Sequence, residues 1–163
     1  MTFTRLFPSR HPSSGSPTYF AEKILNNIKS QGIDTIVAES SFHLNLLDNY
    51  STSVGSKGHT IRSGRDWQKN EFINPHFWEN MPEQSKLVHL PIKLLICSTW
   101  EIRCTNSSQI YINGREIEQT EMIQLAANDG LELDELLSWI IPADNDSPDF
   151  VGQIICWDPQ INY

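Results

Sequence analysis

The second half of the chain carries a series of short strand-like segments separated by turn residues, and this pattern constrains the fold more than any other feature. Alternating apolar and polar residues, or β-branched and aromatic residues, identify the segments as strands. They cover residues 86–90, 94–104, 109–112 and 150–157. Asn113-Gly114 follows the third segment and is a typical tight-turn sequence.

Two short helical patterns interrupt these strands. Residues 118–127 and 133–140 have apolar side chains at helical spacing, and the turn sequence at 128–130 separates them. Short strands interrupted by a few short helices predict an α+β fold, with a mixed β-barrel as the expected form of the sheet.

The N-terminal part predicts a strand at residues 2–7, a loop, and then a helix. Ser16 is the expected N-cap of this helix, with Pro17 at its first position. Phe20, Ile24 and Ile28 recur every four residues and form its apolar face, and Gly32 is expected to end it.

The length of 163 residues suits one hydrophobic core and is too short for two ordinary domains. We therefore expect a single domain over residues 1–163. The mixed pattern at 33–55 fits neither a clear helix nor a clear strand, and we interpret it as an insertion before the central motif.

The charge balance limits the partners of this chain. Lys and Arg total 12 against 20 for Asp and Glu, a formal net charge of -8. Such a field repels phosphate polymers at long range, so duplex DNA is not an expected partner. RNA would need a local basic pocket, and a nucleotide or modified nucleoside is an easier ligand.

Cysteine and histidine spacing gives no indication of a metal site or cofactor. Cys97, Cys104 and Cys156 have no CxxC spacing, so free thiols in a reducing compartment are expected. The five His residues are scattered, and no Gly-rich phosphate loop occurs. No apolar run approaches the ~20 residues of a membrane span, and we expect a soluble, cytoplasmic protein without a bound cofactor.

The segment at residues 57–62 concentrates polar chemistry in six positions. It contains Lys57, His59, Thr60 and Arg62. In an extended strand, Thr60 and Arg62 point to one face, so a hydroxyl and a guanidinium could line one pocket for an anion or a nucleobase edge. The alternative is that the charged residues merely flank the start of a strand.

Two segments together resemble the ASCH domain of the PUA-like superfamily. The first is Lys57-x-x-Thr60-Ile61-Arg62, and the second is residues 126–131 followed by the Leu133-Asp134-Glu135-Leu136 helix. The order of the parts matches the family over about residues 17–157. The resemblance implies a PUA-like barrel with a polar cleft beside the Lys-x-x-Thr strand, in a superfamily linked to RNA binding.

The resemblance also implies an enzymatic alternative. One branch of small ASCH proteins is an amidohydrolase that acts on N4-acetylcytidine with a Lys, a Thr and a Glu. By position these residues correspond to Lys57, Thr60 and Asp129, with Asp in place of Glu. Such a metal-independent mechanism would use the Lys as base and the Thr as nucleophile. Asp129 lies in Asn-Asp-Gly, so a simple turn residue is the alternative.

Further ligand contacts are expected near the motif. Trp67 and Trp78 could stack on unpaired bases, and Arg65 lies beside them in sequence. His59 is a further candidate inside the motif. Packing in the core or at the rim of the barrel is the alternative for the aromatic residues. The sequence therefore favours an RNA- or nucleotide-binding domain, with an amidohydrolase or a non-catalytic protein-interaction module as alternatives.

Overall fold

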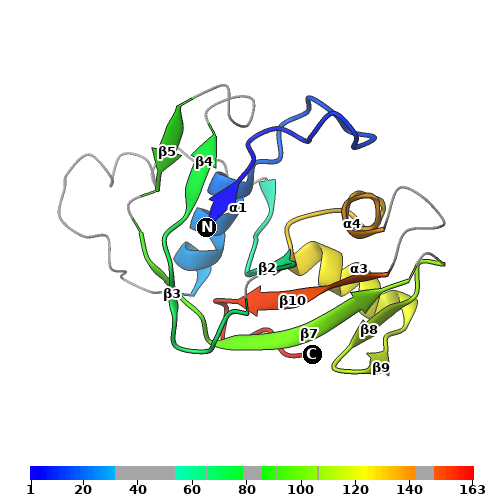
Figure 1. Cartoon of the computed structure of the whole chain (residues 1–163). Helices are drawn as coiled ribbons and strands as arrows, with labels where there is room; N and C mark the ends of the chain where they lie inside the picture. The colour runs from blue at the N-terminus through cyan, green and yellow to red at the C-terminus, as the bar shows by residue number, and fades with distance from the viewer. Residues whose placement is uncertain (32–53, 65, 79–85, 91, 106, 142–148) are drawn as a thin grey trace. The chain divides into compact units, whose positions relative to one another are not determined.

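The computed structural model describes residues 1–31, 54–64, 66–78, 86–90, 92–105, 107–141 and 149–163 (Figure 1). Most of the expected insertion at 33–55 lies outside the described residues, which include only Val54 and Gly55 of it. Arg65 also lies outside the described residues. The chain divides into two compact units that alternate along the sequence. The first unit comprises Met1–Lys57 and Phe72–Leu95, and the second comprises Gly58–Glu71 and Ile96–Tyr163.

The first unit contains two small sheets and one helix. One sheet has the order β1-β4-β5, with β1 parallel to β4 and β4 antiparallel to β5. The other is the antiparallel pair β3-β6. The elements are β1 (Thr2–Phe3), α1 (Phe20–Ser30), β3 (Phe72–Ile73), β4 (His76–Trp78), β5 (Leu87–His89) and β6 (Leu94–Leu95).

Helix α1 buries the face that its sequence spacing predicts, since Phe20, Ile24 and Ile28 are all buried. The Phe20 ring packs edge-on against Phe3 of β1 with ring centroids 6.4 Å apart, which ties the helix to the sheet. The predicted start of the helix at residues 16–17 is wrong. Pro17 instead forms an isolated β-bridge, and the next two residues lead into α1.

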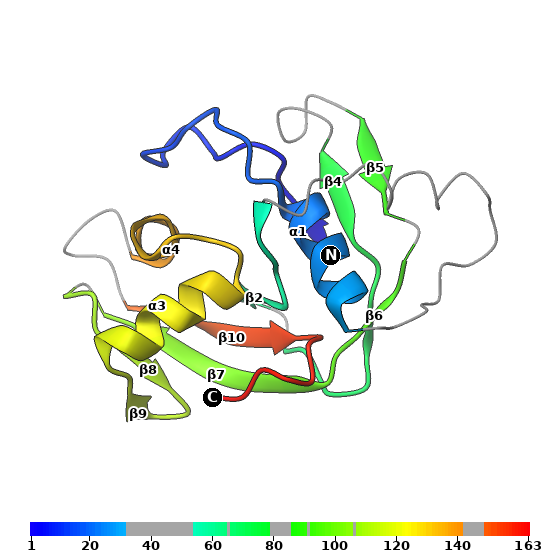
Figure 2. The same ribbon diagram turned by 180° about the vertical axis from the view of Figure 1, so that it is seen from behind.

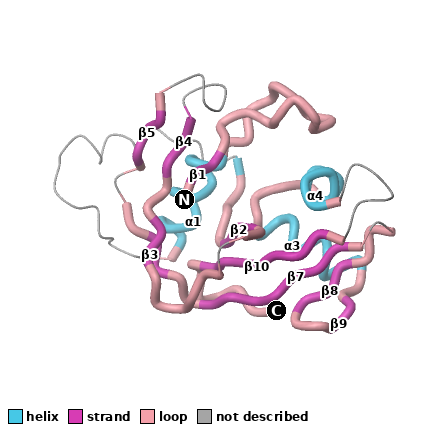
Figure 3. The backbone as a smooth tube through the Cα atoms, in the orientation of Figure 1, coloured by secondary structure: helices cyan, strands magenta, loops and turns pink. Residues whose placement is uncertain are grey.

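The second unit is built on a five-stranded antiparallel sheet with the order β2-β10-β7-β8-β9 (Figure 3). Helix α3 lies across one face of this sheet in both ribbon views, most plainly in Figure 2. The elements are β2 (His59–Arg62), β7 (Ser98–Cys104), β8 (Ile110–Ile112), β9 (Arg115–Glu116), α3 (Gln119–Asn128), α4 (Leu133–Ile140) and β10 (Phe150–Cys156).

The predicted strand at residues 94–104 is two strands in the structure. Leu94–Leu95 pairs with β3, whereas Ser98–Cys104 pairs with β10 and β8. The change of partner occurs between them, because the Ile96 amide donates to Glu71 O (2.9 Å) and the Cys97 amide donates to Cys156 O (2.9 Å). The alternation of apolar and polar residues continues where the chain changes its strand partner. The sequence pattern therefore does not reveal the change.

The local turns match the sequence closely. Asn113 and Gly114 both have positive φ angles, 48° and 80°, as a two-residue hairpin between β8 and β9 requires. Gly130 (φ 74°) ends α3: its amide donates to Ala127 O (3.0 Å), and the Leu131 amide donates to Ala126 O (2.9 Å). This hydrogen-bond pair is the Schellman arrangement, and it sets where Asp129 lies.

Together these elements confirm a mixed α/β structure with a few short helices. Among the described residues there are three helices, and none of the three sheets closes into a barrel. Of the helices described, none has both the length and the apolar character needed to cross a membrane.

Candidate functional site

Strand β2 carries most of the polar motif and forms one side of the described five-stranded sheet. Thr60 is paired with Ile155, and Arg62 with Gln153, in the β2–β10 register. Because side chains alternate along a strand, Thr60 and Arg62 share one face of the sheet while His59 points to the other. Thr60 is buried and Arg62 is half-buried.

Asp129 is the C-cap of α3, one residue before the left-handed Gly130. Its residue exposure is only 5%. The carboxylate oxygen Oδ1 lies 3.6 Å from Nδ1 of His59, whose side chain is fully buried. The structure thus brings together two of the residues that the sequence predicts, from the start of β2 and the end of α3.

The other ring nitrogen of His59 lies in a polar environment of its own. Nε2 is 2.8 Å from the hydroxyl of Tyr163 and 3.2 Å from the carbonyl oxygen of Leu125. The Asn128 side-chain amide donates to the same hydroxyl over 2.8 Å. A polar cluster made of His59, Asn128, Asp129 and Tyr163 therefore occupies the end of α3, with His59 and Asp129 buried and the other two half-buried.

Arg62 is coupled to this cluster through charge. Burial lowers the pKa of the Arg62 guanidinium, and the negative charge of Asp129 opposes that shift by raising the pKa. Desolvation is the larger of the two effects. Burial thus reduces the hydration of the Arg62 guanidinium, and the Asp129 carboxylate stabilises its charge.

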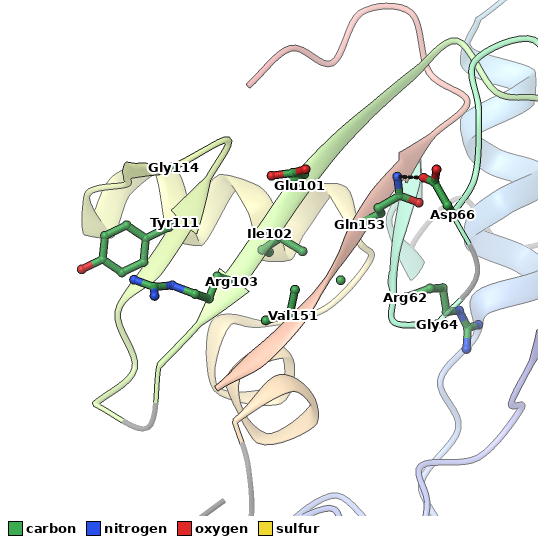
Figure 4. A pocket seen from close by; sticks show the side chains of 11 residues that line it. Arg62, Gly64, Asp66, Glu101, Ile102, Arg103, Tyr111, Gly114, Val151 and Gln153 are labelled. Atoms are coloured by element: carbon green, nitrogen blue, oxygen red, sulfur yellow. Dashed lines mark hydrogen bonds between the residues drawn. The ribbon is translucent and has the colours of Figure 1, made fainter. Parts of the chain in front are cut away.

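Arg62 also lines an open groove of about 600 Å³ in the second unit (Figure 4). Two cross-strand rows of side chains form it. One row is Arg62, Gln153 and Glu101, and the other is Val151, Arg103 and Tyr111. The full lining is Arg62, Gly64, Asp66, Glu101, Ile102, Arg103, Tyr111, Gly114, Val151, Gly152 and Gln153.

The polar side chains of the groove are held in place by one another. The Arg103 guanidinium lies over the Tyr111 ring, 4.7 Å from its centroid, as Figure 4 shows. Gln153 donates to Asp66 over 2.7 Å and accepts a hydrogen bond from the Trp67 amide over 2.8 Å. The groove thus presents an aromatic ring, two cations and several carboxylate or amide oxygens.

Lys57 and Trp78 belong to the first unit. The Lys57 side chain is fully buried, and its Nζ lies 4.3 Å from the Phe20 ring centroid and 5.9 Å from that of Phe3. Its backbone amide donates to Lys23 O (3.0 Å). Trp78 is half-buried at the end of β4.

Trp67 belongs to the second unit and is half-buried there. Its backbone contact with Gln153 places it next to the groove, but its ring is not among the side chains that line it. The structure therefore supports Arg62 as a groove residue and places Asp129 beside His59. Trp67 and Trp78 belong to different units.

The sequence did not indicate Tyr163 or Asn128. Tyr163 lies 104 positions from His59, and no motif connects them. Asn128 is in the predicted turn, where an Asn is ordinarily explained by backbone geometry alone. A polar residue immediately before Asp129 was the available signal.

The three cysteines all lie in the second unit. Cys97, Cys104 and Cys156 are free thiols. A hydrogen bond with Cys156 is the main cause that lowers the pKa of Cys97 to about 7, whereas that bond and burial raise the pKa of Cys156. Within the described residues, no group of three or more His, Cys, Asp or Glu side chains could hold a metal ion.

Comparisons with protein-family models, with curated proteins and with solved structures gave no match for this chain.

Proposed function

We propose that this chain is an ASCH-type domain of the PUA-like superfamily that binds a nucleotide or a modified nucleoside. The site would include Thr60, Arg62 and Asp129, together with the groove that Arg62 lines. The role of Lys57 rests on the resemblance of residues 57–62 to the family motif.

The observation that carries this proposal is the open groove that Arg62 lines together with Arg103 and Tyr111. The Arg103 guanidinium lies 4.7 Å from the centroid of the Tyr111 ring, so a cation and an aromatic ring lie side by side in the groove. A phosphate or a carbonyl edge of a base would accept charge-assisted hydrogen bonds from a guanidinium at this position.

The groove chemistry favours a small ligand over a long polynucleotide. A volume of about 600 Å³ lies within the range of small-molecule sites. Tyr111 offers an aromatic ring, while Gln153 and Glu101 offer groups that can pair with a base edge. Glu101 and Asp66 lie in the same groove, and the whole chain carries a formal net charge of -8. Both facts disfavour the binding of a run of several phosphates.

Equilibrium titration with cytidine, CMP and a short single-stranded RNA tests the proposal. We expect CMP to bind and Arg62→Gln to weaken its binding by roughly 10- to 100-fold, the equivalent of about 1.5–3 kcal/mol for a hydrogen bond to a charged group. Arg10→Gln is the matched control, because Arg10 is an exposed arginine outside the groove.

An unchanged affinity in Arg62→Gln would show that CMP binds elsewhere. Tight binding of the RNA without binding of CMP would assign a polynucleotide ligand. If none of the three probes binds, the nucleotide-binding proposal fails, and the non-catalytic interaction module becomes the better reading.

Burial of the titratable groups favours amide hydrolysis as a second candidate. Lys57 and Asp129 are both buried, and Asp129 is held beside His59. Catalytic lysines often occupy such desolvated positions. In the proposed reaction, the Thr60 hydroxyl loses its proton and attacks the acetyl carbonyl of N4-acetylcytidine. The C–N bond then breaks, and the amine takes up a proton and leaves as cytidine. Water then releases the acetyl group from Thr60 as acetate.

Chromatography of cytidine released from N4-acetylcytidine tests this candidate. We expect turnover in the wild type, loss of turnover in Lys57→Ala and Thr60→Ala, and partial activity in Thr60→Ser, which keeps a hydroxyl. Lys93→Ala is the control for Lys57, since Lys93 is exposed. Absence of turnover in a wild type that still binds nucleosides would exclude hydrolysis of this substrate and leave the binding proposal standing.

A further inference from the structure

Two of the three thiols lie together at one end of the five-stranded sheet, and neither lines the groove. Cys97 directly precedes β7 and is half-buried, whereas Cys156 is the last residue of β10 and is buried. We infer that this pair is a reversible oxidation site: a hydroperoxide oxidises Cys97, and Cys156 first activates Cys97 and then closes a disulfide with it. The inference goes beyond nucleotide binding and does not depend on it.

The backbone holds the two cysteines next to each other. Ser98 is the register partner of Cys156 in the β7–β10 pairing, and the amide of Cys97, one residue earlier, donates to Cys156 O (2.9 Å). The Cys97 Sγ atom donates to the same carbonyl oxygen over 3.3 Å. Both the backbone and the sulfur of Cys97 therefore contact Cys156 itself. Residues this close on paired strands suit a disulfide, which needs Cα atoms about 4.4–6.8 Å apart.

The two thiols differ as an attacking thiol and a resolving thiol should. A hydrogen bond with Cys156 is the main cause that lowers the pKa of Cys97 to about 7, against burial and the charge of Asp158, which raise it. The same hydrogen bond, together with burial, raises the pKa of Cys156. At neutral pH a large share of Cys97 is therefore thiolate, the form that attacks a peroxide, while Cys156 stays a protonated donor.

The reaction needs a hydroperoxide as its oxidant and proceeds in two steps. The Cys97 thiolate attacks one peroxide oxygen, so an S–O bond forms and the O–O bond breaks. The peroxide is thereby reduced to water or an alcohol, and Cys97 is oxidised to a sulfenic acid. The Cys156 thiol then loses its proton and attacks Cys97 Sγ. The S–S bond forms, the S–O bond breaks, and hydroxide leaves with that proton as water.

Closing the disulfide leaves the surrounding carbonyl groups satisfied. The Cys156 Sγ atom donates to Gly58 O (3.4 Å) and to Asp158 O (3.2 Å), and a disulfide would remove this donor. Gly58 O also accepts from the Trp157 and Asp158 amides, and Asp158 O accepts from the Ile161 amide. Both carbonyl oxygens therefore keep a backbone donor, so oxidation does not carry the cost of an unsatisfied buried group.

Cys104 is the internal comparison for this pair. It is buried at the other end of β7, and its Sγ atom donates to Thr105 O over 3.6 Å. Burial is the main cause that raises its pKa to about 11. Cys104 is therefore a protonated thiol at neutral pH and should resist the oxidant that modifies Cys97.

Peptide mass spectrometry of the full chain after brief treatment with hydrogen peroxide at pH 7 tests the inference. The protein is first reduced and freed of reductant; after the treatment, remaining thiols are blocked with iodoacetamide in urea, and digestion follows without reductant. We expect two peptides joined through Cys97 and Cys156, and their separation by dithiothreitol. Cys104 should be recovered in its alkylated form.

Cys156→Ala removes both roles of the buried thiol. Cys97 should then be oxidised roughly 10-fold more slowly at pH 7, because its thiolate loses a hydrogen-bond donor, and the product should be a sulfenic acid that dimedone traps. Cys104→Ala is the matched control, since it also removes a buried thiol, and it should leave the rate and the disulfide unchanged. Urea denaturation checks that both variants are folded, and the wild-type peptide map decides the disulfide without either variant.

Four results would overturn the inference. In the wild type these are a Cys97 that stops at sulfenic or sulfinic acid, a disulfide that joins the Cys97 residues of two molecules, and a Cys104 that is oxidised as fast as Cys97. The fourth is a folded Cys156→Ala protein whose Cys97 reacts at the wild-type rate. None of these results depends on CMP binding, so this inference and the proposed function fail separately.

Discussion

Gly152 is the point where strand packing and the candidate site meet, and Gly152→Ala probes both. A Cβ atom at this position would overlap the carbonyl oxygen of Arg62 and lie 3.0 Å from both its carbonyl carbon and the Cε1 atom of Phe150. The first two atoms are backbone and cannot rotate away. The added methyl group must therefore push β2 and β10 apart beside the paired residues Arg62 and Gln153.

The expected cost follows from overpacking. Inserting a methyl group into a packed interior costs about 1–3 kcal/mol when the backbone has to shift. For a chain of this size, each kcal/mol lowers the melting temperature by roughly 2–4 °C. Displacement of Arg62 should also weaken CMP binding by about 10-fold or more, because one charge-assisted hydrogen bond is misaligned.

Urea denaturation and CMP titration measure these two effects on one variant. Gly15→Ala is a suitable control, because no atom lies within 4 Å of the added Cβ and the cost comes from its left-handed backbone (φ 78°). That variant should lose about 1–2 kcal/mol of stability and keep its CMP affinity. A Gly152→Ala protein with wild-type stability and affinity would refute the close approach of β2 and β10.

Two further predictions concern titration. Cys97 should react with iodoacetamide with a rate midpoint near pH 7, while Cys104, whose pKa is raised to about 11, stays unreactive at that pH; peptide mass spectrometry would detect the reverse order. Glu121, whose pKa is lowered from 4.5 to about 2 by its hydrogen bonds with Arg115, should stabilise the fold fully above pH 4.5 and lose this effect as the pH falls toward 2. The stability of Glu121→Gln, measured over the same acid range, should not show this loss. The same pH dependence of stability in the wild type and in Glu121→Gln would contradict the prediction. High salt should reduce the difference, because this ion pair is exposed.

Local elements of the fold could be predicted well from the sequence. The hairpin at Asn113-Gly114 and the end of α3 at Gly130 depend on residues that tolerate positive φ, which is a property of single residues. Both C-terminal helices begin with a capping box: the Glu118 amide donates to the Glu121 carboxylate, and the Glu132 amide donates to the Glu135 carboxylate (3.0 Å each). Such contacts span three residues and are visible in the sequence.

Long-range pairing could not be predicted in the same way. The alternation through residues 94–104 suits one strand, yet the chain changes partners at Ile96 and Cys97 because Glu71 and Cys156 supply the acceptors there. The start of α1 was also missed: Pro17 bridges to Leu6, so the favourable sequence for an earlier start is used in another contact. Glu71, Cys156 and Leu6 all lie outside the local sequence of the residues that they contact.

In the candidate site, too, local features could be predicted from the sequence and long-range contacts could not. The sequence by itself determined that Thr60 and Arg62 share a strand face and that Asp129 precedes a helix-ending glycine, since both follow from backbone periodicity and local conformation. Only the tertiary structure decided that His59 contacts Asp129 and that Tyr163 completes the cluster. These contacts join residues 70 and 104 positions apart, and packing of the sheet against α3 brings them within hydrogen-bonding distance or close to it, which no local pattern encodes.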